Sequence, residues 1–317
     1  MTKIAVTGGS GQLGSLIVRR LLDRPDIDTV VSIDRSPPPS PVRKLEYVEA
    51  DVRDEDLHKH FAQCAAVVHC AFLVTQNAPP ALLRSVNVEG SRNVFRAVAA
   101  AGVEHLVHLS SMMAYGSVAG HPVPIVEGAP RIYQGDFPYA ACKHRVEALL
   151  DEFEVAHPQI AVCRLRPAVL LGRDMPHILG WLLRWKIVPA HGGAPLPIVA
   201  DEDVADLAVL ALDKRARGAF NASADELLTA EDIAKRFGMW VLAIPRIFVH
   251  GYRGLDWCLK RVGLNLAYDA SWLTKTQGVM LVMSSERAKR ELGWSPRHAT
   301  AHAVLAHFLE LASKKTD

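Results

Sequence analysis

The chain contains few cysteines for its length, and their spacing excludes the common cysteine-based folds. Its 317 residues include 5 cysteines, an odd number, and no Cys-x-x-Cys pair. Disulfide-stapled domains and zinc-binding modules need paired or closely spaced cysteines, so both classes are excluded. This usage is typical of a reducing compartment, and we expect a cytoplasmic protein.

Long hydrophobic runs and an excess of either charge are also missing. No stretch reaches the roughly 18 apolar residues that span a membrane, and no charged-then-apolar leader opens the chain. Lysine plus arginine number 36 and aspartate plus glutamate 34, which gives a net charge of +2 and no broad attraction to nucleic acid or acidic membranes. The 14 histidines show no His-Glu-x-x-His or similar spacing, so we predict no metal site.

What is present is ordinary globular composition, with 50% hydrophobic and 22% charged residues, and a regular alternation of strands and helices. Strand-like runs are 3–7, 29–33, 45–48, 65–70, 105–109 and 160–165, and segments of helical period are 12–22, 86–101 and 139–153. This order predicts an α/β fold of the Rossmann type, a doubly wound parallel sheet with helices on both faces.

The alternation is lost after Gly172, although a helix over 203–212 and a strand over 218–221 are still expected. We therefore predict two domains. The Rossmann domain is 1–171, to which 203–221 returns, and the smaller, mainly helical substrate domain is built from inserts 172–202 and 222–317.

A glycine-rich turn joins the first expected strand to the first expected helix. Gly8, Gly11 and Gly14 stand in Thr-Gly-Gly-Ser-Gly-Gln-Leu-Gly. Such glycines permit a tight turn and close approach of the backbone to a pyrophosphate, which then faces the free N–H groups of the helix start. The motif predicts an NAD-binding domain, with cofactor contacts from Gly8, Ser10, Gly11, Gln12, Leu13 and Gly14.

An acid ends the second expected strand, where it can accept hydrogen bonds from the adenosine ribose hydroxyls. This residue, Asp34, would repel a 2′-phosphate, so we expect NAD(H) rather than NADP(H). Arg35 beside it could bind that phosphate, and a solvated strand end is the alternative interpretation of Asp34.

Tyrosine, lysine and serine form the candidate catalytic group. Tyr139 and Lys143 are four residues apart at a helix start, so both lie on one helical face. A nearby ammonium lowers the pKa of a phenol, which then exchanges a proton with a substrate oxygen. Ser111 follows the fifth strand and could hold that oxygen. The alternative interpretations are that Tyr139 and Lys143 lie on an ordinary surface helix and that Ser111 is an ordinary turn residue.

These pieces carry a family resemblance. The chain resembles the extended branch of the short-chain dehydrogenase/reductase superfamily, which includes nucleotide-sugar epimerases, dehydratases and 3β-hydroxysteroid dehydrogenases. The matching segments, in family order, are 7–14, Asp34, 51–54, 69–71, 87–90, 110–116, 139–143, 166–167 with Gly172, and 291–296.

The resemblance implies roles for individual residues. Asp51 would accept from the adenine amino group beside Val52, and Cys70 and Ala71 would line the cofactor cleft. The remaining implied cofactor contacts are Asn87, Pro167, Tyr139 and Lys143, the last two shared with the catalytic set. Relatives often dimerise through helices near 89–101 and 139–153, so a homodimer is expected.

Two departures from the family pattern bear on the substrate. Nucleotide-sugar members carry a diphosphate-binding Asn and Arg, where this chain has Ala168–Val169 and Leu196. We expect an NAD(H)-dependent oxidoreductase that interconverts a ketone and a secondary alcohol on an apolar small molecule. A nucleotide-sugar epimerase or dehydratase is the alternative function, and a non-enzymatic protein that senses NAD is a third interpretation.

The Trp-rich segment 239–283 is interpreted as core, as an apolar substrate pocket, or as a patch that touches a membrane or partner.

Overall fold

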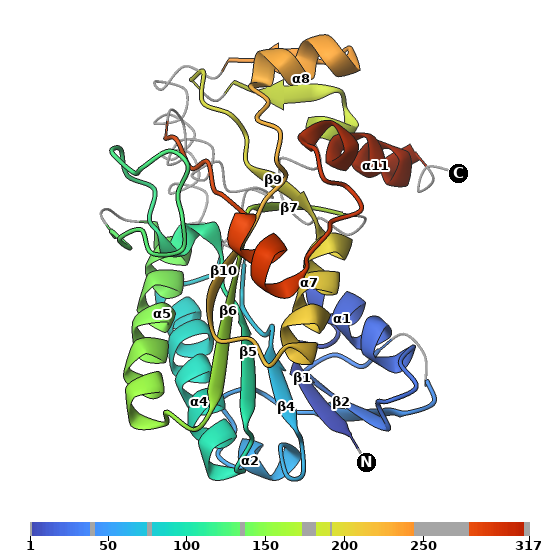
Figure 1. Ribbon diagram of the computed structural model, residues 1–317, viewed down its shortest axis with the longest axis vertical. Helices are drawn as coiled ribbons and strands as arrows, with labels where there is room; N and C mark the ends of the chain where they lie inside the picture. Colours follow the sequence, from blue (N-terminus) through green and yellow to red (C-terminus); the bar gives the residue numbers. More distant parts are fainter. Residues whose placement is uncertain are drawn as a thin grey trace, which may run out of the picture.

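The molecule has two lobes, a large one around a parallel sheet and a smaller one above it in Figure 1. The computed structural model describes residues 2–38, 42–74, 78–133, 137–172, 182–190, 192–243 and 279–313. The seven strands of the large sheet, in the order β10-β6-β5-β4-β1-β2-β3, are all parallel. Their bounds are β1 Lys3–Thr7, β2 Thr29–Asp34, β3 Leu45–Glu49, β4 Ala66–His69, β5 His105–Leu109, β6 Ala161–Pro167 and β10 Gly218–Ala222. The predicted doubly wound sheet is confirmed.

Helices cover both faces of this sheet (Figure 1). Helices α1 (Gln12–Leu22) and α7 (Asp201–Asp213) pack on one face, and α2 (Leu57–His60), α4 (Gly90–Ala100) and α5 (Pro138–Ala156) on the other. The central strands β4, β5 and β6 are buried along their whole length, including the histidines of β4 and β5 and the arginines of β6.

One predicted helix differs from the structure. The segment 86–101 is not a single α-helix, because α3 (Pro80–Leu83) and a π-helical segment η1 (Arg84–Glu89) precede α4. The side chain of Asn87 bonds to the backbone of Leu73, and the Ser91 hydroxyl donates to the Asn87 carbonyl. These bonds hold Asn87 against the chain after β4, where a wider helical turn accommodates it.

The smaller lobe is built from two short parallel pairs of strands and two helices within the described residues. β7 (Val169–Leu171) pairs with β9 (Ile198–Ala200), and β8 (Ile187–Pro189) pairs with β11 (Trp240–Leu242). The helices are α8 (Ala230–Phe237) and α11 (Ala301–Ser313), while the short segments η2 (Met112–Ala114) and η3 (Ala288–Leu292) lie outside this lobe's core. A separate apolar core holds the lobe together.

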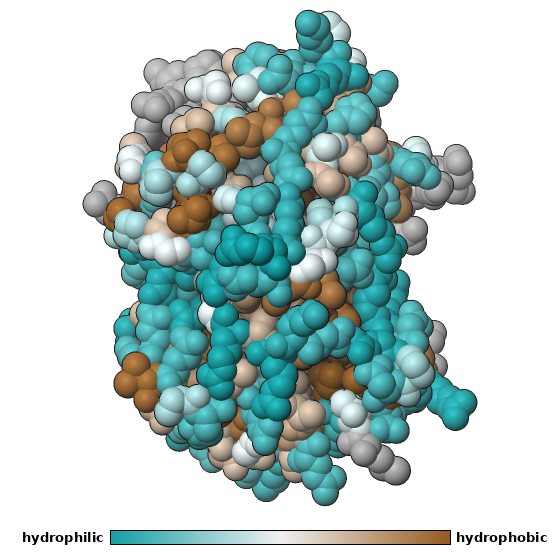
Figure 2. All heavy atoms as spheres, viewed as in Figure 1, coloured by the Kyte–Doolittle hydropathy of each residue, from teal (hydrophilic) through white to brown (hydrophobic). Residues whose placement is uncertain are grey.

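The apolar segment predicted over 239–283 is described only at its ends, because 244–278 lie outside the described residues. Trp240 on β11 is 80% exposed, and Val241 and Leu242 are also exposed. Figure 2 shows hydrophobic residues gathered in the upper part of the face in view, whereas the lower part is mostly hydrophilic.

The register of the large sheet brings the loops that follow several strands to one edge. Thr7 pairs with His69, His69 with His108, and Leu109 with Leu165. The segments after β1, β4, β5 and β6 therefore leave the sheet together, at the edge that faces the smaller lobe (Figure 1). Open α/β sheets bind their ligands at this edge.

A buried carboxylate fixes helix α5 against strands β5 and β6. Glu147 has no exposed surface, and its carboxylate accepts from the Ser110 hydroxyl at 2.6 Å and from Arg166 at 2.7 and 2.8 Å. Arg131 and Arg164 approach the same carboxylate at 3.1 and 3.3 Å. Burial opposes ionisation, but Arg166 and Arg164 outweigh it and lower the pKa of Glu147 to about 2.

Two buried histidines lie side by side under the same edge. His69 of β4 and His108 of β5 have ring centroids 5.2 Å apart. His69 bonds through both ring nitrogens, to Thr7 at 2.7 Å and to Ser91 at 2.9 Å, whereas neither nitrogen of His108 has a partner among the described residues. Burial lowers the pKa of His69 to about 3 and that of His108 well below its usual value.

These histidines make the fold sensitive to acid. The native pKa of each lies below the unfolded value of about 6.5, so between these values the unfolded chain binds a proton that the native chain excludes. Stability is therefore fully present above about pH 6.5 and falls as the pH falls. Replacing His108 by Leu should reduce the loss between pH 6 and 4.5 by about 1.4 kcal/mol per pH unit, measured by urea unfolding. An unchanged slope would contradict this account, and exposed His302→Gln is the control.

Removal of the Glu147 charge should destabilise the whole large lobe. Glu147→Gln leaves the buried Arg166 guanidinium without its counter-ion, and we expect a loss of about 3–5 kcal/mol in the free energy of unfolding. Asp151 also pairs with Arg164, but its side chain is 46% exposed. Asp151→Asn should therefore cost at most about 1 kcal/mol. Chemical denaturation of the two variants compares these values directly, and equal losses would refute the assignment.

Candidate active site

The glycine turn after β1 is built by close backbone contacts. Gly8 has a φ of +71°, and a Cβ there would lie 2.6 Å from the Ala71 nitrogen. A Cβ on Gly14 would lie 2.0 Å from the Gly8 carbonyl oxygen, while Gly11 donates its N–H to that same oxygen at 3.0 Å. Glycine is therefore required at both Gly8 and Gly14, since any side chain would push the turn away from the sheet.

The turn leaves helix α1 open at its amino end. Helix α1 begins at Gln12 with Gly11 as its cap residue, and no described side chain caps it. The N–H groups of Gln12, Leu13 and Gly14 precede the first intrahelical bond and point out of the helix. An uncapped helix start with a cradle that a Cβ would fill fits the phosphates of a dinucleotide.

Asp34 lies directly over this turn. One carboxylate oxygen accepts the Ser10 N–H at 3.0 Å and the other accepts the Ser36 N–H at 3.1 Å. Each oxygen retains a further lone pair, so the carboxylate could accept from ribose hydroxyls as well. The Arg35 side chain is 75% exposed and reaches only to 4.0 Å from Asp51.

The Asp51 carboxylate is already engaged. Arg53 holds it through two guanidinium bonds of 2.8 and 2.9 Å and through its own N–H at 3.0 Å. Little acceptor capacity remains on Asp51 for an adenine amino group. Val52 is buried beside it, against Gly90 of α4.

Each of the four further predicted cofactor residues is held in place by its own contacts. Cys70 donates its N–H to the Thr7 carbonyl, and Ala71 follows it against Gly8. Burial raises the pKa of the Cys70 thiol to about 12, so it stays protonated. Asn87 is fully buried, and its side-chain amide forms hydrogen bonds with the Leu73 backbone. Pro167 ends β6, buried in pairing with β10.

The serine and tyrosine of the candidate catalytic group meet. The Ser111 hydroxyl is close enough to Tyr139 to lower the pKa of its phenol. Ser111 is held in place as the cap of η2, where its hydroxyl accepts the Met113 N–H at 3.2 Å. Tyr139 lies in the first turn of α5, which Pro138 opens with its φ already fixed for a helix.

Lys143 lies one turn further along α5 and is 3% exposed. Its ammonium donates to the Leu109 carbonyl at 2.8 Å, lies 3.6 Å from the centroid of the Phe72 ring, and is 5.9 Å from that of Tyr139. Burial lowers the pKa of Lys143 to about 7, against the opposing charge of Glu147. The group is therefore poised between its charged and neutral forms near neutral pH.

The sequence predicts that Lys143 lowers the pKa of Tyr139, and here the structure differs. Burial raises the pKa of the phenol, and the nearby Ser111 hydroxyl offsets only part of this. The ammonium is directed at Leu109 and Phe72 instead of the phenol oxygen. In the chain by itself, tyrosine activation is thus incomplete.

Three elements of this site were missed in the sequence. Phe72 contacts both the Lys143 ammonium and, edge to face, the Tyr139 ring, with centroids 5.7 Å apart. Glu147, one turn beyond Lys143, anchors the helix through Ser110. Asp201 bonds to the Gln12 side chain. The four-residue spacing of Tyr139, Lys143 and Glu147 was a signal for the second of these.

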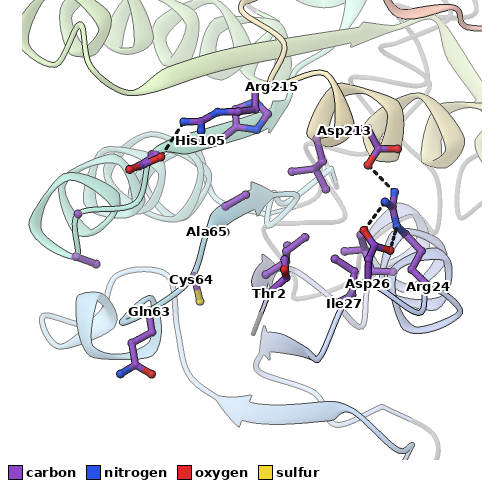
Figure 3. Close-up of a pocket in the computed structure, with 17 residues that line it drawn as sticks. Thr2, Arg24, Asp26, Ile27, Gln63, Cys64, Ala65, His105, Asp213 and Arg215 are labelled. Atoms are coloured by element: carbon purple, nitrogen blue, oxygen red, sulfur yellow. Dashed lines mark hydrogen bonds and ion pairs between the residues drawn. The ribbon is translucent and has the colours of Figure 1, made fainter.

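A hollow of about 470 Å³ opens at the opposite edge of the sheet (Figure 3). It lies at the amino ends of β1, β4 and β5 and contains none of the predicted site residues. Its charged groups neutralise one another, because Arg24 pairs with Asp26 and Asp213, and Arg215 pairs with Glu104. The hollow is therefore separate from the candidate active site.

Metal binding and membrane insertion can also be judged from the part of the chain that the structure describes. Its histidine, cysteine and acidic side chains form no group of three that could hold a metal ion. None of its helices combines the length and the apolar character needed to cross a membrane.

Comparisons with known proteins agree with this geometry. The family model described as "NAD dependent epimerase/dehydratase family" matches residues 4–222. An uncharacterized protein of Mycobacterium tuberculosis is 28% identical over 322 residues, covering 96% of this chain and 83% of that protein. The 3 beta-hydroxysteroid dehydrogenase/Delta 5-->4-isomerase of Vaccinia virus is 28% identical over 189 residues, covering 54% of this chain and 53% of that protein.

Among solved structures, the Bordetella bronchiseptica enzyme WbmG in complex with NAD and UDP is similar, with a TM-score of 0.74 and 21% identity. The match covers 98% of this chain and 94% of that one, and at this identity it shows the shared fold. The family model spans well over half of the chain. This protein therefore belongs to the NAD-dependent epimerase/dehydratase family.

Proposed function

We propose that the protein transfers hydride between NAD(H) and an apolar substrate, interconverting a ketone and a secondary alcohol. The observation that carries this proposal is the approach of the Ser111 hydroxyl to the Tyr139 phenol, with Lys143 one turn away on α5. This group lies at the same sheet edge as the glycine turn. A dinucleotide on the turn would extend along that edge towards the phenol.

The roles of the three side chains follow from their chemistry. When bound, NADH supplies the hydride that reduces the carbonyl carbon. The Tyr139 hydroxyl gives a proton to the carbonyl oxygen, and the Ser111 hydroxyl donates a hydrogen bond to the same oxygen. Lys143 in its charged form stabilises the phenolate that remains. Phe72 covers the ammonium and keeps water from it.

A preference for NAD(H) is part of the proposal. Asp34 presents a negative charge over the turn, held by the Ser10 and Ser36 N–H groups. A 2′-phosphate in that position would be repelled by the carboxylate. The exposed Arg35 side chain works in the opposite direction, although it can swing into solvent.

An apolar substrate is favoured over a nucleotide sugar by two buried positions. Ala168 is 5% exposed after β6, and Leu196 is 4% exposed within the core of the smaller lobe. Neither offers a charge or an amide to a diphosphate, which charged hydrogen bonds recognise best. The viral relative's name, a steroid dehydrogenase and isomerase, points towards apolar ring substrates.

A nucleotide-sugar epimerase or dehydratase is the second candidate, favoured by the family description and by neighbours that bind UDP. Such an enzyme would use the same tyrosine but return the hydride to its substrate. The cofactor would then show no net change, which separates the two candidates in a simple assay.

The domain boundaries, the cellular location and the oligomeric state are also proposals. We propose that residues 1–171 and 203–221 form the cofactor domain and that the rest forms the substrate domain, because β10 pairs with β6. The last three residues before this boundary, β7, pair with β9 of the smaller lobe instead. The four described cysteines are free thiols, which supports a reducing, cytoplasmic location. A homodimer through α4 and α5 stays a proposal from the family resemblance.

Tyr139→Phe should abolish turnover and leave NAD(H) binding nearly unchanged. Loss of a general acid costs about 10²–10⁴-fold in rate, and the substitution removes only the hydroxyl. NADH oxidation would be followed by absorbance with a panel of apolar ketones, and cofactor affinity by calorimetry. Tyr133→Phe, which removes a phenol outside the catalytic group, is the matched control and should keep its activity. Retained turnover in Tyr139→Phe would contradict the proposed function.

The same assay separates the two candidate functions. Absence of net NADH oxidation in the unsubstituted protein, with NAD⁺ retained on purification, would favour the nucleotide-sugar candidate.

Asp34→Ala should shift cofactor preference towards NADPH. Removal of one opposing charge contributes on the order of 1.4 kcal/mol, so the ratio of kcat/KM for NADPH over NADH should rise about tenfold. Arg35→Ala in the same background should reverse part of the gain, since the guanidinium then no longer meets the 2′-phosphate. A ratio unaffected by Asp34→Ala would argue against this role.

A further inference from the structure

Asp201 occupies the junction between the two lobes. It is the first residue of α7 and directly follows β9, the strand that joins the smaller lobe. The residue is 4% exposed. One carboxylate oxygen accepts from the Gln12 side-chain amide at 2.9 Å, and the other accepts the Glu202 N–H at 2.8 Å.

The contact with Gln12 reaches the cofactor turn itself. Gln12 is the first residue of α1, so its backbone N–H is one of the groups that face a phosphate. Its side chain is held by Asp201 at the connection from β9 to α7, 189 residues away in the chain. The glycine turn and Asp201 are therefore joined by one direct hydrogen bond.

The end of β7 also lies against the Asp201 carboxylate. A Cβ on Gly172, which follows β7, would lie 1.7 Å from a carboxylate oxygen of Asp201. Since β7 pairs with β9, both strands of this small sheet end against Asp201. The carboxylate thus has the cofactor turn on one side and the end of the small sheet on the other.

Ion pairs also join α1 and the residues just after it to α7, but they lie away from the turn. Arg20 pairs with Asp206 at 2.7 Å and with Glu202 at 3.7 Å, and Arg24, which follows α1, pairs with Asp213 at 2.6 Å. These ion pairs hold the two helices together along their length. Gln12 to Asp201 is the contact among the described ones that includes a residue of the glycine turn.

We propose that Asp201 is a positioning residue that couples cofactor binding at the glycine turn to the smaller, substrate-side lobe. Phosphates bound at the start of α1 immobilise Gln12, and Gln12 in turn immobilises the junction of β9 and α7. The small sheet is then ordered before a substrate enters. This inference rests on the proposed binding of NAD at the turn.

Hydrogen exchange with and without NAD⁺ tests the coupling on the full chain. In the unsubstituted protein, NAD⁺ should slow exchange in peptides that cover 8–14 and also in those that cover 198–202. Asp201→Ala should keep the first effect and lose the second, and Gln12→Ala should lose the second. Asp201→Asn retains an acceptor oxygen and should restore the second effect. Asp206→Asn breaks an ion pair between the same two helices and should leave both effects intact.

The outcomes separate the inference from the function on which it rests. No slowing at 8–14 in the unsubstituted protein would remove cofactor binding at the turn. Slowing at 8–14 without slowing at 198–202, or equal slowing at 198–202 in Gln12→Ala, would overturn the coupling alone. Gln12 is only partly buried, so Gln12→Ala remains a folded test if Asp201→Ala does not fold.

Discussion

The buried carboxylate of Glu147 is the interaction on which the candidate active site depends. It joins helix α5 to β5 through Ser110 and to β6 through Arg166. Tyr139 and Lys143 precede it on the same helix, and Ser111 follows Ser110 in the chain. A shift of α5 by a fraction of a turn would separate the tyrosine from the serine. The charge is tolerable in the interior only because several guanidinium groups surround it.

Burial disfavours the charged form of both titrating groups of the site, which raises the pKa of Tyr139 and lowers that of Lys143. It disfavours the phenolate of Tyr139 and the ammonium of Lys143 alike, because both are charged forms in a medium of low dielectric. A lysine with a pKa near 7 changes its charge readily when a ligand brings a new charge close to it. A negative charge near Lys143 would favour its ammonium, and that ammonium would in turn favour the phenolate in the proposed proton transfer.

The fold does not determine the substrate, because family members that share this fold catalyse different overall reactions. What distinguishes this chain is local. Ala168 and Leu196 are buried without polar groups, and apolar side chains such as Trp240 are exposed in the smaller lobe. A contact such as Gln12 to Asp201 is equally specific to these residues, because it needs an acid at the start of α7 and a glycine at the end of β7.

The sequence by itself determined the parallel sheet and the residues that gather at its edge. Apolar runs alternating with helical periods leave few other folds, and the glycines of the turn are dictated by contacts that admit no side chain. The sequence could not show that Asn87 would widen a helical turn, that Phe72 would cover Lys143, or that Asp51 would be occupied by Arg53. Nor could it show that Asp201 would reach Gln12. Those contacts join residues far apart in the chain or depend on side-chain direction, so only the packed tertiary structure decides them.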